Sequence, residues 1–128
     1  MIGKIITKLL VDDATVNGLV GGRIFAILME ENTKTPAISY TITEISPNYA
    51  KTTWVDDVIH FQVSVFTKSY AESNTVTLAV RNALERQAGT FGTTKMNYIY
   101  FEGYREEYDQ EGDSYVLTLN FRTSIKQY

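Results

Sequence analysis

Residues 69–89 carry the strongest secondary-structure signal in this chain. Apolar side chains recur there at helical spacing and share one stripe: Val76, Ala79, Val80, Ala83, Leu84 and Ala88. Ser69 and Glu72 have the spacing of a capping box, and Gly89 suits the left-handed residue that ends a helix. Segments that resemble β-strands flank this stretch on both sides. We therefore predict a helix over residues 69–89 that packs on a β-sheet.

The length and composition are typical of a single domain without covalent cross-links. The chain has 128 residues, no cysteine and a formal net charge of −3. A chain of this length buries roughly two-thirds of its unfolded surface, which is enough for one hydrophobic core. Without cysteine there is no disulfide or thiolate metal site, and the negative charge disfavours a protein that grips phosphate backbones. We expect one domain over residues 1–128, with no signal peptide and no membrane contact.

The N-terminal half predicts one amphipathic helix followed by strands. The helix spans 2–11, because its apolar residues repeat at helical spacing: Ile2, Ile5, Ile6, Leu9 and Leu10. Asp12 or Asp13 can cap a further helical turn that ends at Gly21 and Gly22. Strands are expected over 23–28, 37–45 and about 55–67, and the polar stretch 46–53 is expected to be the exposed arm of a long hairpin.

The C-terminal half predicts two long strands, 96–108 and 114–126, joined by a turn at 109–113. Residues 90–95 are polar and are expected to connect the helix over 69–89 to the first of these strands. The predicted order is therefore α-β-β-β-α-β-β. This order indicates an α+β fold, with a single antiparallel or mixed sheet and two helices packed on one face.

Four tyrosines are expected on one face of the strand over 96–108: Tyr98, Tyr100, Tyr104 and Tyr108. They alternate with Ile99 and Phe101, which we place toward the helices. Because the helices cover only one face of a single sheet, the tyrosine face is left to water or to another protein. Tyrosine is enriched at protein interfaces, but tyrosines also stabilise sheets through cross-strand pairs, and both interpretations stay open.

No recognisable catalytic motif is present. The sequence contains no HExxH, no P-loop and no GxGxxG. The one histidine, His60, faces outward on its predicted strand, with Ser64 two pleat steps away and Asp56 and Asp57 before it. A general base needs an orienting partner and a pocket, so a solvent-facing imidazole is the favoured interpretation. We predict no enzyme, no catalytic or metal-binding residues and no cofactor.

Acidic residues cluster at the tip of the predicted C-terminal hairpin: Glu106, Glu107, Asp109, Glu111 and Asp113. Alternating carboxylates with a glycine are compatible with a calcium loop, but the full EF-hand pattern is missing. A solvated hairpin tip is therefore the favoured interpretation. A third possibility is a surface that repels polyanions such as DNA.

The order of elements and several short stretches resemble a known family. The clearest are Leu19-Val20-Gly21-Gly22-Arg23-Ile24-Phe25 and Pro36-Ala37-Ile38-Ser39-Tyr40. They are followed by "IHFQVSVFTKS", by the helical "AVRNALE" and by the tyrosine-rich hairpin. Over nearly its whole length the chain is similar to the tail-completion proteins of long-tailed bacteriophages and prophages, which are also called tail-terminator or head–tail joining proteins.

The resemblance implies a structural virion protein that forms a homohexameric ring on the head-proximal end of the tail tube. Such a ring ends tube polymerisation and joins the tail to the head connector, and DNA only passes through it without specific binding. The implied partners are further copies of the chain, the tail tube protein and the head–tail connector protein. The implied location is the tail or neck of the virion, with assembly in the bacterial cytoplasm. A neighbouring connector subunit of the same fold is the other role that the resemblance allows.

Two sets of residues are candidates for these contacts. The interface set combines the four tyrosines with the arm residues Tyr49, Lys51 and Trp54. The acidic run is the candidate lining of the DNA channel. The alternative function is a small ligand-binding or calcium-binding α+β domain that uses His60 and the acidic 106–113 hairpin.

Overall fold

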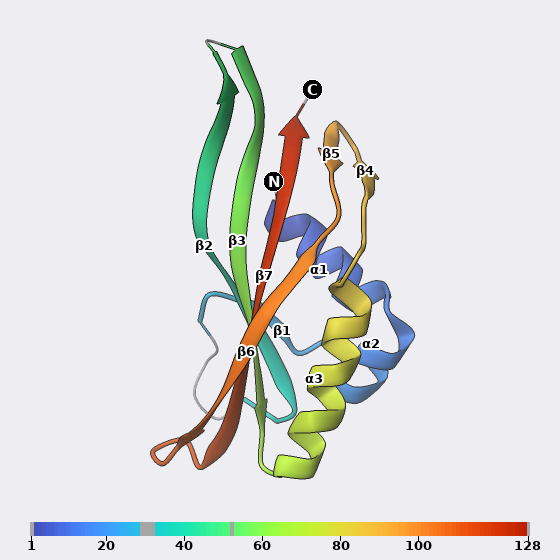
Figure 1. Cartoon of the computed structure of the whole chain (residues 1–128). Helices are drawn as coiled ribbons and strands as arrows, with labels where there is room; N and C mark the ends of the chain where they lie inside the picture. Colours follow the sequence, from blue (N-terminus) through green and yellow to red (C-terminus); the bar gives the residue numbers. More distant parts are fainter. Residues whose placement is uncertain (1, 29–32, 52, 128) are drawn as a thin grey trace.

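The computed structural model describes residues 2–28, 33–51 and 53–127, except for the side chains of Thr53, Trp54 and Gln127. Among these residues, three helices and seven strands follow in the order α-α-β-β-β-α-β-β-β-β. In chain order they are α1 (Ile2–Asp12), α2 (Ala14–Val20), β1 (Ile24–Ala26), β2 (Ala37–Ala50), β3 (Thr53–Thr67), α3 (Tyr70–Leu84), β4 (Gly89–Phe91), β5 (Thr94–Met96), β6 (Tyr100–Asp109) and β7 (Ser114–Gln127) (Figure 1). None of these helices is long and apolar enough to cross a membrane.

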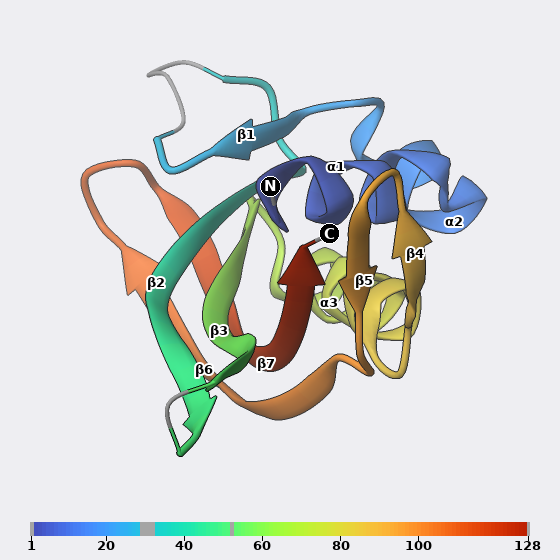
Figure 2. The same ribbon diagram turned by 90° about the horizontal axis from the view of Figure 1, so that it is seen from above.

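The strands form one mixed sheet in the order β1-β2-β3-β7-β5-β4, and β6 also pairs with β7. The β1–β2 pair is parallel and the other pairs are antiparallel. Figure 2 shows that this sheet curls around α1, so the helices lie on its concave side. The α+β class and the mixed sheet are therefore confirmed.

Helix α3 begins where the sequence predicts and ends earlier. The Ser69 hydroxyl accepts a hydrogen bond from the Glu72 amide at 3.4 Å, so Ser69 caps the helix. The predicted end at Gly89 is wrong, because the backbone already becomes extended at Glu85. The Arg86 amide donates to the Ile99 carbonyl at 2.8 Å, and this pairing draws the chain out of the helix.

Residues 14–20 form a third helix where the sequence predicted only a further turn. Asp13 caps it by accepting a hydrogen bond from the Val16 amide at 3.0 Å. Gly21 closes the other end in the left-handed conformation, with φ at 58°. Capping at both ends stabilises a helix of only seven residues, so the prediction of two helices is corrected to three.

One hydrophobic core lies between the helices and the concave face of the sheet. Phe61 of β3 stacks on Phe121 of β7 with ring centroids 5.3 Å apart, and Phe101 of β6 meets Phe121 edge-on at 5.6 Å. The helices contribute Ile2, Ile5, Ile6, Leu10, Val16, Val20, Val76, Ala79, Val80, Ala83 and Leu84. The even-numbered residues of β3 and β7 lie on the opposite, convex face, which no described helix covers. We call this the outer face.

Two strand predictions need correction. Residues 90–95 are not a plain connection, because β4 and β5 form a small hairpin there whose second strand pairs with β7. The single strand predicted over 96–108 is divided into β5 and β6, which follow the same edge of β7. The division occurs because Ile99 exchanges backbone hydrogen bonds with residues 86–87 and not with β7.

Candidate interaction surfaces

The β2–β3 hairpin projects beyond the rest of the sheet as an arm (Figure 1). Its pairing continues to Ala50 and Thr53, whereas the pairing of β3 with β7 begins only at Asp57. The predicted exposed arm is therefore confirmed, although position 52 at its tip lies outside the described residues. Tyr49 is 59% exposed, and Lys51 adopts a positive φ of 60° at the turn. The Trp54 backbone pairs with Tyr49, and its side chain is outside the described part of the chain.

A β-bulge in β6 separates the four tyrosines. Phe101 pairs with Phe121, but the next pair along the ladder is Gly103 with Asn120, so Glu102 is an extra residue. Gly103 has a φ of 123°, which favours glycine. A shift of one residue exchanges the faces of all side chains that follow it. The bulge therefore reverses the inward and outward alternation of β6.

The prediction that the four tyrosines share one face is consequently wrong. Tyr100 pairs with Arg122, which places it on the outer face. After the bulge, Tyr104 pairs with Leu119 and therefore lies on the side of the sheet that carries the helices. Tyr108 pairs with Tyr115 on that same side, and Tyr98 precedes β6. All four side chains are 48–58% exposed, so they are accessible from two different sides of the molecule.

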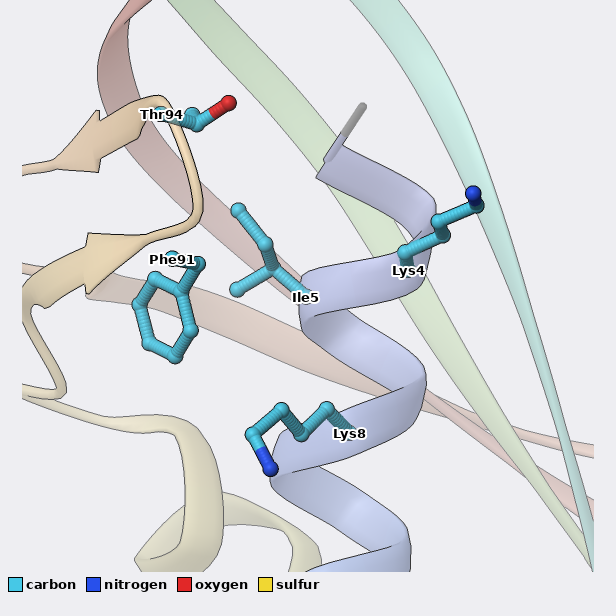
Figure 3. A pocket seen from close by; sticks show the side chains of 5 residues that line it. All are labelled: Lys4, Ile5, Lys8, Phe91 and Thr94. Atoms are coloured by element: carbon cyan, nitrogen blue, oxygen red, sulfur yellow. The ribbon is translucent and has the colours of Figure 1, made fainter.

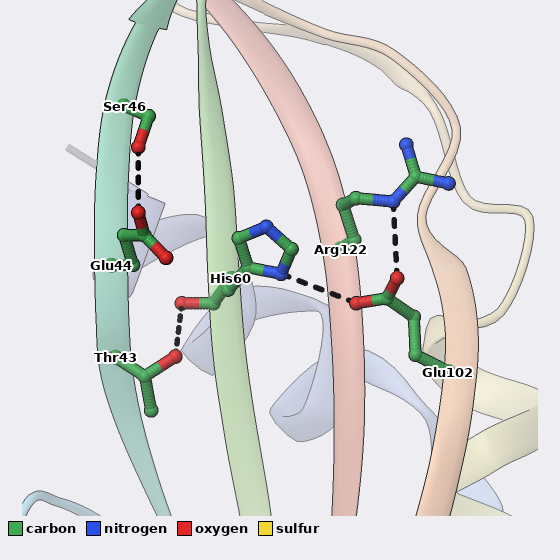
Figure 4. A network of polar contacts seen from close by, with 6 residues as sticks. All are labelled: Thr43, Glu44, Ser46, His60, Glu102 and Arg122. Carbon is green, nitrogen blue, oxygen red and sulfur yellow. Dashed lines mark hydrogen bonds and ion pairs between the residues drawn. The ribbon is translucent and has the colours of Figure 1, made fainter.

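A charged network surrounds the bulge on the outer face (Figure 4). Glu102 lies between two partners: Oε1 is 3.2 Å from Nδ1 of His60, and Oε2 accepts a hydrogen bond from Nε of Arg122 at 3.2 Å. The Arg122 guanidinium in turn lies over the Tyr100 ring, 4.9 Å from its centre. The outward orientation of His60 is confirmed. Sequence analysis missed the role of Glu102, although an isolated glycine inside a strand is a recognised signal of a bulge.

The residues around His60 do not form a hydrolytic triad. The Ser64 hydroxyl lies 3.1 Å from the Thr118 hydroxyl, and the only described acidic partner of His60 is Glu102. His60 and Glu102 are each 36% exposed and sit on an open sheet face. A general base that is oriented against a buried nucleophile is therefore not assembled among the described residues.

The second group of tyrosines forms a patch where the β6–β7 hairpin meets the start of α3. The Tyr115 ring packs edge-on against both Tyr70 and Tyr108, with centroid distances of 5.7 and 5.1 Å. The Tyr70 hydroxyl donates to Glu106 at 2.6 Å, and the Tyr108 hydroxyl donates to Asp113. We define the tyrosine patch as Tyr70, Tyr104, Glu106, Tyr108, Asp113 and Tyr115.

These hydrogen bonds affect the ionisation of the two phenols. The bond to Glu106 raises the pKa of Tyr70 above its usual value, with partial desolvation and the glutamate charge acting in the same direction. The bond to Asp113 raises the pKa of Tyr108 for the same reasons. Both phenols therefore remain neutral donors that fix the position of a carboxylate at the surface.

The hairpin carboxylates do not converge on a common point. Glu106 accepts from Tyr70, and Glu107 accepts from Nε of Arg105 at 2.6 Å. Asp109 accepts from the Glu111 amide at 3.2 Å, while Asp113 accepts from Tyr108. Within the described chain, no three histidine or acidic side chains are grouped so that they could hold a metal ion. The structure also does not bring His60 to this hairpin, so the residues of the alternative function do not form one site.

A cavity of about 220 Å³ lies between α1 and the β4–β5 hairpin (Figure 3). Lys4, Ile5, Lys8, Phe91 and Thr94 line it. The Lys4 and Lys8 ammonium groups point in different directions, and Lys8 is paired with Asp12 at 2.7 Å. Specific ligand binding usually requires several polar groups that converge, so this cavity has no recognisable binding chemistry.

Comparison with known proteins gives one family and one fold. The model of the family described as "Tail completion protein gp17" matches residues 4–126. Among solved structures, the chain is similar to one titled "Virion of native gene transfer agent (GTA) particle", with a TM-score of 0.81 and 19% identity. That alignment covers 94% of this chain and 90% of the other, and it shows a shared fold. No curated protein sequence matches the chain significantly.

Proposed function

The chain belongs to the Tail completion protein gp17 family, and on that premise we propose that it forms a ring that caps a tail tube. Membership makes it a tail completion protein, which is a component of a phage-like virion. The proposed ring is homohexameric, sits on the head-proximal end of the tube, stops tube polymerisation and joins the tail to the head connector. In this proposal residues 1–128 act as one tail-terminator-like domain, assembled in the bacterial cytoplasm.

The distribution of helices on the sheet supports a role in assembly. All three described helices lie on the concave side of the sheet, while the arm and the outer face carry exposed aromatic side chains, including Tyr49 and Tyr100 (Figure 2). A contact between two different surfaces of identical copies closes into a ring when the rotation between copies divides a full turn. The chain offers several such surfaces on different sides, and this is the observation that carries the proposal.

The contact residues are proposed as three groups, because the bulge divides the tyrosines. Tyr98 and Tyr100 belong to one contact, and Tyr104 and Tyr108 belong to a second. The arm residues Tyr49, Lys51 and Trp54 form a third contact, with the tube or with the connector. Glu106 and Asp113 accept hydrogen bonds from Tyr70 and Tyr108 and are assigned to the second contact, so the remaining acidic residues of the hairpin are proposed to line the passage for DNA: Glu107, Asp109 and Glu111. Their charge would keep DNA from adhering while it slides through.

A tube elongation assay tests this function. Purified tail tube protein of the same particle is polymerised in the presence of increasing amounts of the chain, and tube length and cosedimentation are measured. We expect tubes to stop growing at one end, with the chain present in the pellet at a fixed ratio per tube end. Unchanged tube lengths together with a chain that stays in the supernatant would overturn the proposal.

A further inference from the structure

Two lysines face each other across adjacent strands at one end of the sheet. Lys95 of β5 is directly opposite Lys126 of β7, and both side chains are exposed. Their neighbours in the ladder, Met96 and Ile125, are buried, so the lysines lie on the outer face. Like charges placed directly opposite in a sheet are destabilising. Neither lysine forms an ion pair with a described residue, and Asp56 on the neighbouring strand β3 is not paired with them either.

The tyrosine patch lies at the opposite end of the same strand. Tyr115 stands at the start of β7 and Lys126 near its end, which is a separation of roughly 36 Å along an extended strand. Figure 1 shows the β6–β7 turn at one end of the molecule and β5 with the C-terminus at the other. The lysine pair therefore cannot reach the carboxylates of its own tyrosine patch, although another copy of the chain can supply them.

Two strand edges of this sheet are poorly suited to pairing with a strand of another copy of the chain. The free edge of β6 is broken by the bulge at Glu102, and the arm edge of β2 carries further register shifts and Pro47, which has no amide hydrogen. Bulges and proline are features that prevent edge-to-edge strand addition. These two edges therefore favour a contact between copies that side chains make.

We propose that the Lys95–Lys126 pair of one copy docks on the tyrosine patch of the next copy. The ammonium groups meet the Glu106 and Asp113 carboxylates, which Tyr70 and Tyr108 hold in place, and the lysine stems cover the exposed tyrosine rings. This contact rests on the proposed ring, because it joins two different surfaces of identical chains. The carboxylates of the next copy also offset the repulsion between the two lysines.

Charge reversal in two complementary variants tests this contact. One variant carries Lys95→Glu and Lys126→Glu, and the other carries Glu106→Lys and Asp113→Lys. The fraction of chain in rings is measured by mass photometry in the presence of tail tube protein. Each variant alone places like charges at every contact between copies, so we expect the ring fraction to fall about tenfold or more.

Mixing the two variants in equal amounts is the decisive measurement. In a ring of alternating variants every contact again joins opposite charges, so we expect the mixture to recover most of the wild-type ring fraction. Lys34→Glu, an exposed lysine outside these surfaces, is the matched control and should assemble as wild type. Because Glu106→Lys and Asp113→Lys remove the hydrogen-bond partners of Tyr70 and Tyr108, the milder Glu106→Gln and Asp113→Asn changes are measured beside them and should weaken assembly less than reversal does.

The possible results separate this inference from the proposed function. If wild-type chain forms rings and each reversal variant assembles equally well, the lysine contact is wrong and the ring proposal stands. A mixture that fails to recover, while both variants keep the wild-type melting temperature, also overturns the lysine contact. If wild-type chain forms no ring beside tube protein, the proposed function itself fails.

Discussion

Gly103 stands opposite Asn120 in the β6–β7 ladder, where an unbroken register from Phe101 would place Glu102. The inserted residue is Glu102, and its carboxylate meets His60 and Arg122 on the outer face. It also directs Tyr104 to the side of the sheet that carries the helices. One bulge therefore divides the tyrosines of β6 between the outer face and the tyrosine patch.

Replacing Gly103 with alanine tests whether the bulge requires glycine. No atom would contact the added methyl group, so the cost comes only from the positive φ of 123°. We expect a loss of about 1–2 kcal/mol in the free energy of unfolding, measured by urea denaturation. Gly18→Ala is the control, because it adds a methyl in open space inside α2 without a positive φ, and it should stabilise by about 0.4–1 kcal/mol. If Gly103→Ala loses no stability, or gains as much as Gly18→Ala does, the bulge is not strained and does not require glycine.

Tyr100→Ala and Tyr104→Ala should weaken assembly independently of each other, because the two residues lie on opposite faces of the sheet. We expect both variants to keep the wild-type fold by circular dichroism and to weaken ring formation. Their effects in the double variant should add, as is usual for distant sites without shared partners. Strongly non-additive effects in light-scattering measurements would indicate a single contact, and unchanged assembly in both variants would remove these tyrosines from the interface.

The tyrosine patch should ionise late in an alkaline titration. Because folding raises the pKa of Tyr70 and Tyr108, these phenols keep their protons where the unfolded chain has lost them. The stability that they contribute is fully present below about pH 10 and is lost as pH rises through the folded pKa. We expect Tyr70→Phe and Tyr108→Phe each to remove a late-ionising phenol from the ultraviolet titration. If neither substitution removes a late-ionising phenol from the titration, the two hydrogen bonds are contradicted.

The Glu102 network should contribute little to stability. Glu102 and Arg122 are 36% and 44% exposed, so solvent screens their attraction. A double-mutant cycle with Glu102→Gln and Arg122→Gln should give a coupling energy of about 1 kcal/mol or less by thermal unfolding. A coupling above about 2 kcal/mol would show that the outer face is much less hydrated than its exposure indicates.

The sequence predicted the elements whose hydrophobic period extends over many residues. The stripes of α1 and α3 and the alternation of β3 and β7 have patterns of ten residues or more, and each is confirmed. The hairpin arm was predicted from the turn residues and polarity of 46–53, and it is confirmed as well. The end of α3 was misplaced because Gly89 suggested a cap, whereas tertiary hydrogen bonds to Ile99 end the helix first.

The elements that sequence analysis missed have little or no periodic signal. The strands β4 and β5 have three residues each and are mostly polar, and α2 depends on its two caps. The register of β6 is a property of its pairing with β7, so one inserted residue reversed the predicted faces of Tyr104 and Tyr108. Gly103 was the one local indication of this bulge. The pairing of Lys95 with Lys126 likewise became visible only with the sheet register.

The most direct test of the central claim is electron microscopy of the purified chain mixed with its tail tube protein. The account predicts a six-fold ring of the chain at one end of each tube and no further growth from that end. Tubes with two identical bare ends, beside a chain that stays monomeric, would contradict it.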